Sequence, residues 1–451
     1  MPVEHVAIVG AGFSGTLQAI NLLRHEGPRA TLIERGSRAG EGLAYGAAHP
    51  SHVLNVRAGN MSALPDDPGH FARWLEARGV ADAANSFASR VTYGIYLREM
   101  LDAALATSAG RLTVRYGEVV DAVESGRGVA LKLADGEALD ADAAVLAVGN
   151  LPPHDPPGLN DGALPDDLYK GDPWAGSVAD GLTADDTVLV IGTGLTMIDV
   201  ALMLEARGFQ GRIVALSRRG LLPRRHEAAN DWAKIGDRPA TVASGLVRQV
   251  RERADAVGWR NAVDELRPFT QPMWANATEA ERARFLRHLR PWWDVHRHRL
   301  APEVADRLAA MQDRGQLHVL AGKTIAFSPS DGGVTMTWRP RGGNANEAMA
   351  VRRIVNCTGP LGDLNRTTDP LLVSLRERGA IRPDAAHLGI DVNGVGQVIG
   401  ANGRASERLY ALGPMTRGAF WEIVAVPDIR RQTWDVARRL SNAHWVGGEG
   451  L

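Results

Sequence analysis

Two glycine-rich turns, far apart in the chain, have the residue types and the spacing that bind a dinucleotide pyrophosphate. The first is VAIVGAGFSG, in which Gly10, Gly12 and Gly15 have the G-x-G-x-x-G spacing, and the second is VLVIGTGLTMID, with Gly192 and Gly194. Each turn follows a short apolar run typical of a buried parallel strand and opens a helical pattern. The first glycine permits the tight turn, the second lets the pyrophosphate approach the backbone, and the helix N-terminus offers N–H groups to the phosphates. Two such turns indicate two dinucleotides that meet in one enzyme.

The strand after each turn ends in residues that distinguish the two cofactors. After the first turn the strand ATLIERG ends at Glu34, where a carboxylate accepts hydrogen bonds from an adenosine ribose and repels a 2′-phosphate. After the second turn the strand RIVALSRRG ends at Ser217, Arg218 and Arg219. A hydroxyl and two guanidiniums suit a 2′-phosphate, because bidentate charge-assisted bonds to phosphate are strong. The first site is therefore predicted to hold FAD or NAD and the second to prefer NADPH. The alternative interpretation of the two arginines is a solvent-exposed loop.

Three further residues belong to the same turns. Ser14 and Thr196 lie at the starts of the two predicted helices, and we include both among the cofactor-binding residues. Met197 replaces the third glycine of the second motif, which widens the contact between helix and strand but leaves the phosphate-binding turn intact.

Length and composition fit a globular enzyme. The chain has 451 residues, of which 45% are hydrophobic and 23% charged, and this length suffices for two or three domains. Lys plus Arg number 51 and Asp plus Glu 52, so the overall charge indicates neither a nucleic-acid nor a membrane partner. No apolar run approaches the roughly 18 residues of a membrane span, and the first strand begins too early for a signal peptide. The single cysteine, Cys357, excludes an internal disulfide and agrees with a cytoplasmic location. It also excludes the redox-active cysteine pair that flavin disulfide reductases need.

The predicted fold class is α/β, with two Rossmann-like dinucleotide-binding domains, β-meanders and a helical insert. The segments DAAVLAVGNLPP and RRIVNCTGP are apolar strands that end in turns of small residues, similar to the segments where flavoproteins cross between domains. We predict an FAD-binding domain in two parts, 1–157 and 361–451. The NADPH-binding domain is predicted at 158–360, with the helical insert at about 225–302.

Short alternating strands predict two β-meanders. One runs from Leu112 to Leu139 and is expected to lie over the first sheet, and the other runs from Leu317 to Trp338. Near the C-terminus, SERLYALGPM is expected to form the last strand of the first domain, and the residues after Arg417 are expected to be mostly helical.

The chain resembles flavoproteins with two dinucleotide-binding domains, akin to class B flavin monooxygenases and related FAD/NAD(P)-binding proteins. The segment from Gly40 to Leu75 resembles the part of such proteins that crosses the flavin, and SRVTYGIYLREML resembles the helix that follows. YKGDPW, from Tyr169 to Trp174, is similar to part of a linker fingerprint of these enzymes, but it lacks the His that normally precedes the Trp. This departure argues against a Baeyer–Villiger reaction.

The resemblance implies further site residues. Leu54, Asn55, Gly149 and Gly413 are predicted to bind cofactor, although Gly413 is followed by Pro414 where many relatives carry an Asp. Asn55 and Asn60 are the candidate catalytic residues, because a side-chain amide can hold flavin, nicotinamide or an oxygenated flavin. The alternative is that both asparagines cap turns in a glycine-rich segment.

The insert is rich in tryptophan and arginine, in particular along FLRHLRPWWDVHRHR. One interpretation is a lid that places arginines near an anionic substrate or the NADPH phosphates. The interpretation that we favour is that most tryptophans are core residues and most arginines a solvated face. His296 and His298 are two residues apart and face different ways on a helix, so no metal site is predicted. Cys357 is expected to be a buried, inert thiol.

The resulting hypothesis is an NADPH- and FAD-dependent monooxygenase. Reduced flavin would take up O2 as a C4a-peroxide and oxygenate a small polar metabolite, possibly at nitrogen or sulfur. One alternative is an NADPH-dependent flavin reductase or dehydrogenase with a non-oxygen acceptor. Another is a flavin-binding module whose redox state regulates a partner. Neither the substrate nor the oligomeric state follows from the sequence.

Overall fold

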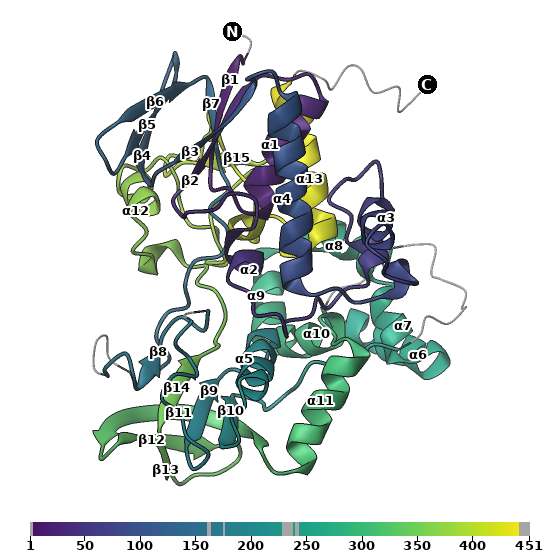
Figure 1. The fold of residues 1–451 in the computed structure, drawn as a ribbon, viewed down its shortest axis with the longest axis vertical. Helices are drawn as coiled ribbons and strands as arrows, with labels where there is room; N and C mark the ends of the chain where they lie inside the picture. Colours follow the sequence, from purple (N-terminus) through teal and green to yellow (C-terminus); the bar gives the residue numbers. More distant parts are fainter. Residues whose placement is uncertain (1–2, 160–163, 175, 228–237, 240–242, 442–451) are drawn as a thin grey trace.

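The computed structural model describes residues 3–159, 164–174, 176–227, 238–239 and 243–441. Within these residues the strands form two large sheets and one small sheet. Figure 1 shows the two large sheets at opposite ends of the molecule, with the helices of the insert beside the junction between them.

The first large sheet combines strands from both ends of the chain, in the order β15-β16-β7-β1-β2-β3. Its strands are β1 (His5–Val9), β2 (Arg29–Glu34), β3 (Leu112–Tyr116), β7 (Ala143–Leu146), β15 (Gln397–Ile399) and β16 (Ala405–Ala411). All neighbours pair in parallel except β15, which is antiparallel to β16. The short apolar runs predicted as buried strands are therefore strands, and the segment SERLYALGPM supplies β16.

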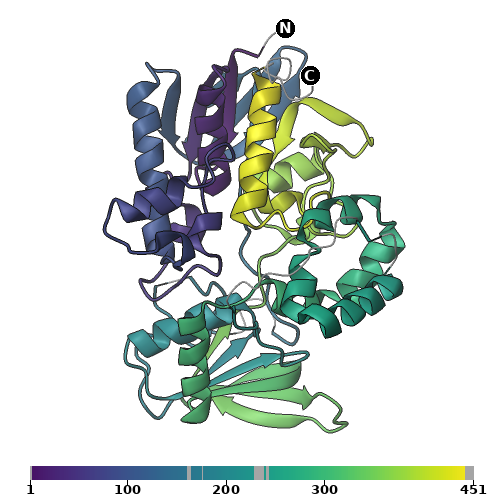
Figure 2. The same ribbon diagram turned by 90° about the vertical axis from the view of Figure 1, so that its right-hand side faces the viewer.

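Helices cover one face of this sheet. They are α1 (Phe13–Arg24), α4 (Arg90–Thr107) and α13 (Val426–Leu440), which lie side by side in Figures 1 and 2. Asn21 Nδ2 of α1 donates a hydrogen bond to Thr433 Oγ1 of α13 at 3.3 Å. The C-terminal helix thus packs directly against the helix that follows the first glycine turn.

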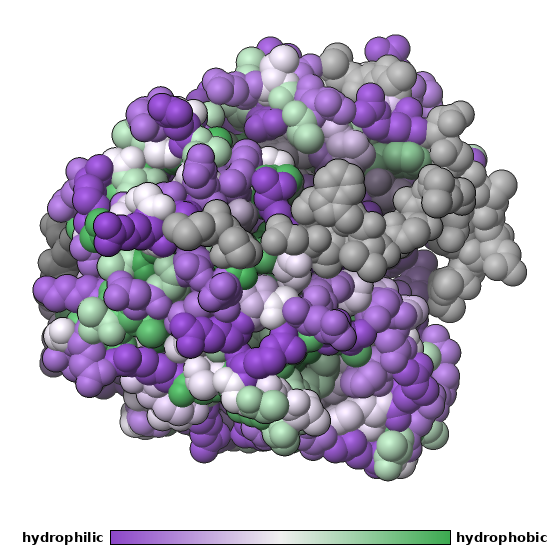
Figure 3. Space-filling model, turned by 90° about the horizontal axis from the view of Figure 1, so that it is seen from above, coloured by the Kyte–Doolittle hydropathy of each residue, from purple (hydrophilic) through white to green (hydrophobic). Residues whose placement is uncertain are grey.

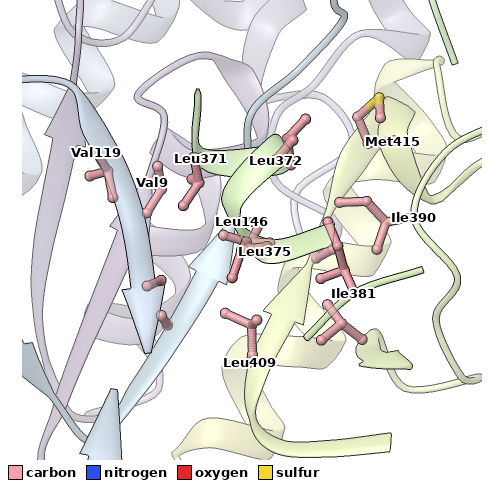
Figure 4. Packing of buried hydrophobic residues seen from close by; sticks show 14 of the residues in the cluster. Val9, Val119, Leu146, Leu371, Leu372, Leu375, Ile381, Ile390, Leu409 and Met415 are labelled. Carbon is pink, nitrogen blue, oxygen red and sulfur yellow. The ribbon is translucent and has the colours of Figure 1, made fainter. Parts of the chain in front are cut away.

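The opposite face is covered by the small antiparallel sheet and one helix. These are β4 (Val119–Ser125), β5 (Gly128–Leu133), β6 (Ala138–Ala141) and α12 (Pro370–Glu377). Figure 4 shows how Leu371, Leu372 and Leu375 of α12 meet Leu146 and Leu409 in a buried core. The predicted meander is correct only from β4 onward, because β3 pairs in parallel with β2 as the edge of the main sheet.

The second large sheet has the order β13-β12-β11-β10-β9-β14-β8. Its strands are β8 (Tyr169–Lys170), β9 (Thr187–Ile191), β10 (Arg212–Ser217), β11 (Leu317–Ser330), β12 (Gly333–Pro340), β13 (Glu347–Val351) and β14 (Arg353–Asn356). The first part of β11 pairs in parallel with β10 and its second part antiparallel with β12. The second predicted meander therefore continues the Rossmann sheet itself. Helices α5 (Leu195–Ala206) and α11 (Pro302–Asp313) pack on this sheet.

The insert between β10 and α11 is helical, as predicted. Its elements are α6 (Ala243–Val257), α7 (Trp259–Asp264), η3 (Arg267–Phe269), α8 (Thr270–Asn276), α9 (Glu279–His288) and α10 (Arg290–Arg297). In Figure 2 these helices stand beside the junction and reach both the C-terminal segment of the first domain and the second domain. The domain boundaries given above remain a prediction, although the membership of the strands in the two sheets agrees with them.

Short elements complete the first domain. They are α2 (Gly42–Gly46), η1 (Ala58–Asn60), α3 (His70–Glu76), η2 (Ala83–Asn85), η4 (Leu364–Arg366) and η5 (Gly413–Thr416). The face in Figure 3 is mostly hydrophilic, with hydrophobic residues scattered singly or in small groups. Among the described residues, none of the helices combines the length and the apolar character needed to cross a lipid bilayer.

Candidate functional site

The first glycine turn leaves the N-terminus of α1 bare. Gly10 has φ +101°, and a Cβ there would lie 2.5 Å from the carbonyl oxygen of Ala147. A Cβ on Gly15 would lie 1.8 Å from the carbonyl oxygen of Gly10. Gly12 begins the helix without a side-chain cap, so its first N–H groups are left for a ligand. The turn therefore has the shape that a pyrophosphate needs.

Glu34 and the loop after α1 frame this turn. The Glu34 carboxylate accepts hydrogen bonds from the N–H groups of Ala11 at 2.9 Å and Gly36 at 2.7 Å. Gly42 packs against Gly12, since a Cβ on Gly42 would lie 2.7 Å from the Gly12 Cα. The segment predicted to cross the flavin thus begins in contact with the phosphate-binding turn, and its flavin-crossing role remains a prediction.

The C-terminal turn at Gly413 closes the other side. Gly413 has φ +74°, and a Cβ there would lie 2.4 Å from Ser14 Oγ. The Gly413 N–H donates to Gln432 Oε1 at 2.8 Å, and Gln432 Nε2 donates to Thr416 Oγ1 at 3.1 Å. The sequence showed that Pro414 stands where an Asp was expected, but it gave no sign that Gln432 would bind this turn. Only the packing of α13 reveals that this amide holds the turn.

The two candidate asparagines lie in different surroundings. Leu54 is buried, and its N–H donates to Ala88 O at 2.8 Å. The Asn55 carbonyl oxygen accepts a hydrogen bond from His226 Nε2 at 3.0 Å, and burial lowers the pKa of this histidine. The Asn55 side-chain amide has no hydrogen bond to a described residue. Asn60 is exposed at the end of η1, and no described hydrogen bond or cavity joins it to Asn55. Their catalytic roles remain a prediction.

Asn55 lies where the first domain meets α5. It lines a cavity of about 10 Å³ together with Arg90, Leu195 and Asp199, and such a space holds at most about one water molecule. Arg90 Nη2 forms an ion pair with Asp199 Oδ2 at 3.1 Å, and both side chains are largely buried. His52 Nε2 lies 3.1 Å from Asp199 O. These contacts tie the start of α4 to the helix of the second glycine turn.

The second glycine turn repeats the geometry of the first. Gly192 has φ +119°, and a Cβ there would lie 2.1 Å from Cys357 O. Gly194 begins α5 without a side-chain cap, and a Cβ at Gly194 would meet no atom within 4 Å. Met197 is fully buried and Thr196 half-buried. This helix N-terminus is therefore also open to a phosphate.

The predicted 2′-phosphate residues lie at the end of β10. The Gly220 N–H donates to Ser217 Oγ at 3.0 Å, and the Thr193 hydroxyl lies 2.9 Å from the same oxygen. Arg218 is exposed, and neither it nor Arg219 has an ion pair with a described residue. The Arg219 guanidinium lies 6.0 Å from the ring centroid of Trp292.

A third arginine approaches this strand end. Arg341 Nη1 donates to the carbonyl oxygen of Arg218 at 3.3 Å. Sequence reasoning missed Arg341, because it follows β12 and reaches β10 only through the pairing of β11 with both strands.

The two crossings between the sheets lie side by side. Gly149, with φ +71°, follows β7, and Leu151 forms an isolated antiparallel bridge with Leu361. Asn356 Nδ2 donates to His154 O at 2.9 Å. Gly149 thus lies at the exit from the first sheet, as the resemblance implied.

Cys357 and the two histidines behave as ordinary structural residues. Cys357 is buried, and burial raises the pKa of its thiol well above the usual value. His296 Nδ1 lies 2.7 Å from Trp292 O, and His298 Nε2 lies 4.0 Å from Glu422 Oε1. No group of metal-binding side chains was found in the described part of the chain.

The interpretation of the insert as mostly core tryptophans and solvated arginines is correct only in part. Of the tryptophans, Trp274 is buried, but Trp292 is 44% exposed. Trp259 and Trp293 are half-buried, and Trp232 lies outside the described residues. Arg299 is almost fully buried in an ion pair with Asp264 at 2.8 Å. Some arginines of this segment therefore have a structural role, whereas others, such as Arg248 and Arg287, are exposed to solvent.

One glutamate joins the insert to the first domain. Glu422 is 1% exposed and accepts a hydrogen bond from Trp293 Nε1 at 2.8 Å. Its carboxylate also pairs with Arg267 at 3.4 Å and Arg297 at 3.1 Å. Arg267 in turn pairs with Asp428 at the start of α13 at 2.6 Å. The insert is therefore docked by buried charges onto the segment that follows the Gly413 turn.

Comparison with known proteins agrees with this arrangement. Residues 7–151 match the model of a family described as FAD-NAD(P)-binding. An uncharacterized protein of Mycobacterium tuberculosis is 27% identical over 147 residues, which are 31% of this chain and 26% of that protein. The chain thus spans about a quarter of the length of this curated relative.

Solved structures resemble the whole chain. An ornithine N-hydroxylase of Kutzneria sp. 744 superposes with a TM-score of 0.67 at 13% identity, over 98% of this chain and 100% of that one. L-lysine 6-monooxygenase from Pseudomonas syringae gives 0.65 at 16% identity, over 98% and 100%. Thioredoxin reductase of T. acidophilum gives 0.54 at 11% identity, over 98% and 99%. The predicted α/β fold with two Rossmann-like domains is confirmed, and the first glycine turn lies within the residues that match the FAD-NAD(P)-binding family.

Proposed function

We propose that this two-domain flavoprotein is an FAD- and NADPH-dependent monooxygenase that transfers an oxygen atom from O2 to a nitrogen or sulfur atom of a small polar metabolite. The observation that carries the proposal is the pair of bare helix N-termini at Gly12 and Gly194, each at the carboxyl end of its own parallel sheet. The likeness in fold to N-hydroxylating monooxygenases supports the same reaction class.

The residues of the first turn fit FAD. Side chains at Gly10 or Gly15 would collide with the backbone, so the turn keeps its N–H groups uncovered for the pyrophosphate. Glu34 is held by two backbone N–H groups and has lone pairs left for a ribose. Ser14 and Gly413 meet beside the same helix N-terminus. These residues would hold the diphosphate and the adenosine of FAD.

The residues of the second turn fit NADPH. The N-terminus of α5 would bind the pyrophosphate, and Arg218, Arg219 and Arg341 surround the strand end where the 2′-phosphate is expected. Three guanidiniums near one site favour a doubly charged phosphate over the bare ribose of NADH.

A flavin bound by these residues would supply hydride acceptance from NADPH and, in its reduced form, activation of O2. The chain must then hold the substrate, keep bulk water out and donate hydrogen bonds without giving up protons. The insert, docked by Glu422, covers the first domain beside the Gly413 turn. The ion pair of Arg90 with Asp199 joins the first domain to the second. Asn55 offers a free neutral amide at this junction, and we assign it the donor role; Asn60 is the weaker candidate.

The likeness to thioredoxin reductase favours the second candidate, an NADPH-dependent reductase with an acceptor other than O2. Disulfide chemistry within the chain does not fit, because Cys357 is the only cysteine in the sequence. A reductase of this kind would pass electrons to another acceptor.

One experiment separates the candidates. The flavin-loaded protein is mixed with NADPH, ¹⁸O2 and amines or thioethers, and product ¹⁸O and hydrogen peroxide are measured per NADPH consumed. A monooxygenase incorporates ¹⁸O with little peroxide. Reduction of the flavin with stoichiometric peroxide and no oxygenated product would support the reductase. Absence of flavin reduction by NADPH would support a regulatory module.

A further inference from the structure

Arg417, the residue directly after η5, has a guanidinium that forms no hydrogen bond or ion pair with a described residue, although the carboxylates of Asp294 and Glu422 lie near enough to act on its pKa. Its side chain is half-buried, and its Nε is buried with no hydrogen-bond acceptor. The terminal nitrogens have no hydrogen bond or ion pair with a described residue either. Burial, and then the nearby charge of Arg290, lower the pKa of Arg417 to about 10. The group nevertheless remains a cation at neutral pH.

The carboxylates around Arg417 already have partners. Glu422 is paired with Arg267 and Arg297, and Asp428 is paired with Arg267. Asp294 lies 3.4 Å from Arg290. Four arginines therefore share three carboxylates, and Arg417 is the arginine left over. Asp294 Oδ1 is also buried without a hydrogen-bond donor, so the cluster has an unused acceptor as well as an unused donor.

Arg417 lies close in sequence to the turn that we predict to bind the flavin. Arg417 follows the turn in which Gly413 meets Ser14, at the N-terminus of α1. From the other side the insert holds the same segment, because Trp274 Nε1 donates to Gly418 O at 2.9 Å. Figure 2 shows the insert beside this part of the first domain. Arg417 thus lies between the predicted flavin site and the helices that cover it.

An aromatic platform holds the guanidinium. Its central carbon lies 4.5 Å from the ring centroid of Trp421, which is 3% exposed and stacks on Trp274 with centroids 4.6 Å apart. A planar guanidinium on an aromatic face keeps its orientation and can bind a carboxylate through two parallel hydrogen bonds. A cation taken from water without a counter-ion costs free energy, which an anionic ligand would offset.

We propose that Arg417 binds a carboxylate of the substrate, so that the enzyme acts on small metabolites that carry this group beside the reacting nitrogen or sulfur. The assignment rests on the proposed function, because it takes the bound compound to be the molecule that is oxygenated. It adds the residue that recognises this molecule and the negative charge that the molecule carries.

The test compares pairs of compounds that differ only in a carboxylate. The pairs are L-lysine with cadaverine, L-ornithine with putrescine, and L-methionine with 3-methylthiopropylamine, so both nitrogen and sulfur atoms are represented. Equilibrium binding to the oxidised, flavin-loaded protein is followed by tryptophan fluorescence, since Trp421 lies under Arg417. In at least one pair the carboxylate compound should bind about tenfold tighter or better, as a charge-assisted hydrogen bond allows.

Three variants test whether Arg417 causes the preference for the carboxylate compound. R417Q should remove the discrimination within the pair, and R417K, which keeps the charge but not the planar fork, should retain part of it. R282Q is the matched control: Arg282 lies 5.2 Å from the ring centroid of Trp274 in the same insert and donates to backbone carbonyls. It should keep the discrimination. Flavin content and the rate of flavin reduction by NADPH report whether each variant remains folded.

The proposal is overturned if the wild type shows no preference for a carboxylate in any pair or binds none of the six compounds. It is also overturned if R417Q, with normal flavin content, keeps the preference. These readouts need no turnover. A protein that selects carboxylates through Arg417 but forms no oxygenated product would refute the proposed monooxygenase and leave this site standing.

Discussion

At the residue scale, the ends of β2 and β10 are predicted to select the nucleotide that each site binds. Glu34 is fixed by backbone N–H groups, whereas Arg218 and Arg219 have no counter-ion among the described residues. We expect Arg218→Ala/Arg219→Ala to lose the preference for NADPH, by about tenfold or more in affinity, because each charge-assisted contact contributes roughly 1.5–3 kcal/mol. Flavin reduction rates with NADPH and NADH measure this ratio. A preference that is absent in the wild type, or that survives the double change, would refute the assignment.

A second residue-scale prediction concerns Asn55. Its carbonyl oxygen accepts a hydrogen bond from His226, and its side-chain amide has no hydrogen bond to a described residue. Asn55→Ala therefore removes a neutral donor without removing a hydrogen bond seen among these residues. Hydride transfer needs only the stacking of nicotinamide on flavin, whereas oxygen transfer needs a fixed donor in a dry site. Flavin reduction should stay near normal while hydrogen peroxide released per NADPH increases. Asn60→Ala serves as the comparison. Unchanged coupling, or a defect confined to flavin reduction, would remove Asn55 from this role.

At the element scale, the start of α1 is predicted to bind the pyrophosphate of the flavin. A Cβ on Gly12 would meet only the Gly42 Cα, at 3.4 Å, whereas one on Gly15 would strike the turn itself. Gly12→Val should therefore fold but place its side chain against the pyrophosphate, and the purified protein should be colourless. The 450 nm absorbance per protein measures this, with thermal unfolding as the check on folding. A fully flavinylated Gly12→Val protein would contradict the assignment.

A second prediction at the element scale concerns Glu422, which anchors the helical insert to the first domain. Glu422 is buried between Arg267, Arg297 and Trp293, so Glu422→Ala leaves two cations without their shared partner. We expect a loss of about 3–5 kcal/mol in the free energy of unfolding, as for other broken buried pairs. The control is Asp306→Ala, which removes an exposed pair with Arg225 and should cost about 0–1 kcal/mol. Urea unfolding of both variants measures the difference. Equal effects would mean that Glu422 does not anchor the insert.

At the scale of the whole molecule, buried histidines make stability depend on pH. Burial lowers the pKa of His52, His154 and His226, which lie at the junction of the domains, below the ordinary 6.5. The unfolded chain then binds more protons than the folded one as the pH falls through 6.5, so stability decreases toward acid. Urea midpoints at pH 7.5 and 5.5, at constant ionic strength, should show the fall. A midpoint that is level or higher at pH 5.5 would contradict this account.

Much of the fold could be predicted from local patterns. The glycine turns and the short apolar strands follow from spacing and apolar runs, because a parallel strand followed by a helix has a local signature. The placement of SERLYALGPM in the first sheet followed from the resemblance to flavoproteins with two dinucleotide-binding domains, and the structure confirms it. The meanders were predicted only in part. Whether Leu112–Tyr116 pairs with β2 or with β4 depends on a partner strand distant in sequence, which alternation alone does not specify.

The amino-acid sequence alone was enough to identify the two glycine turns, the contrast between Glu34 and Ser217-Arg218-Arg219, and the absence of a cysteine pair. These depend on backbone conformation and residue chemistry within a few positions of one another. Three contacts could be seen only in the tertiary structure. Gln432 accepts a hydrogen bond from the Gly413 turn, Arg341 donates to Arg218 at the end of β10, and Glu422 forms ion pairs with Arg267 and Arg297 of the insert. Only the tertiary structure shows that Arg417 has no ion pair with a described residue. The nearby carboxylates of Glu422, Asp428 and Asp294 are paired with arginines that are distant in sequence from Arg417.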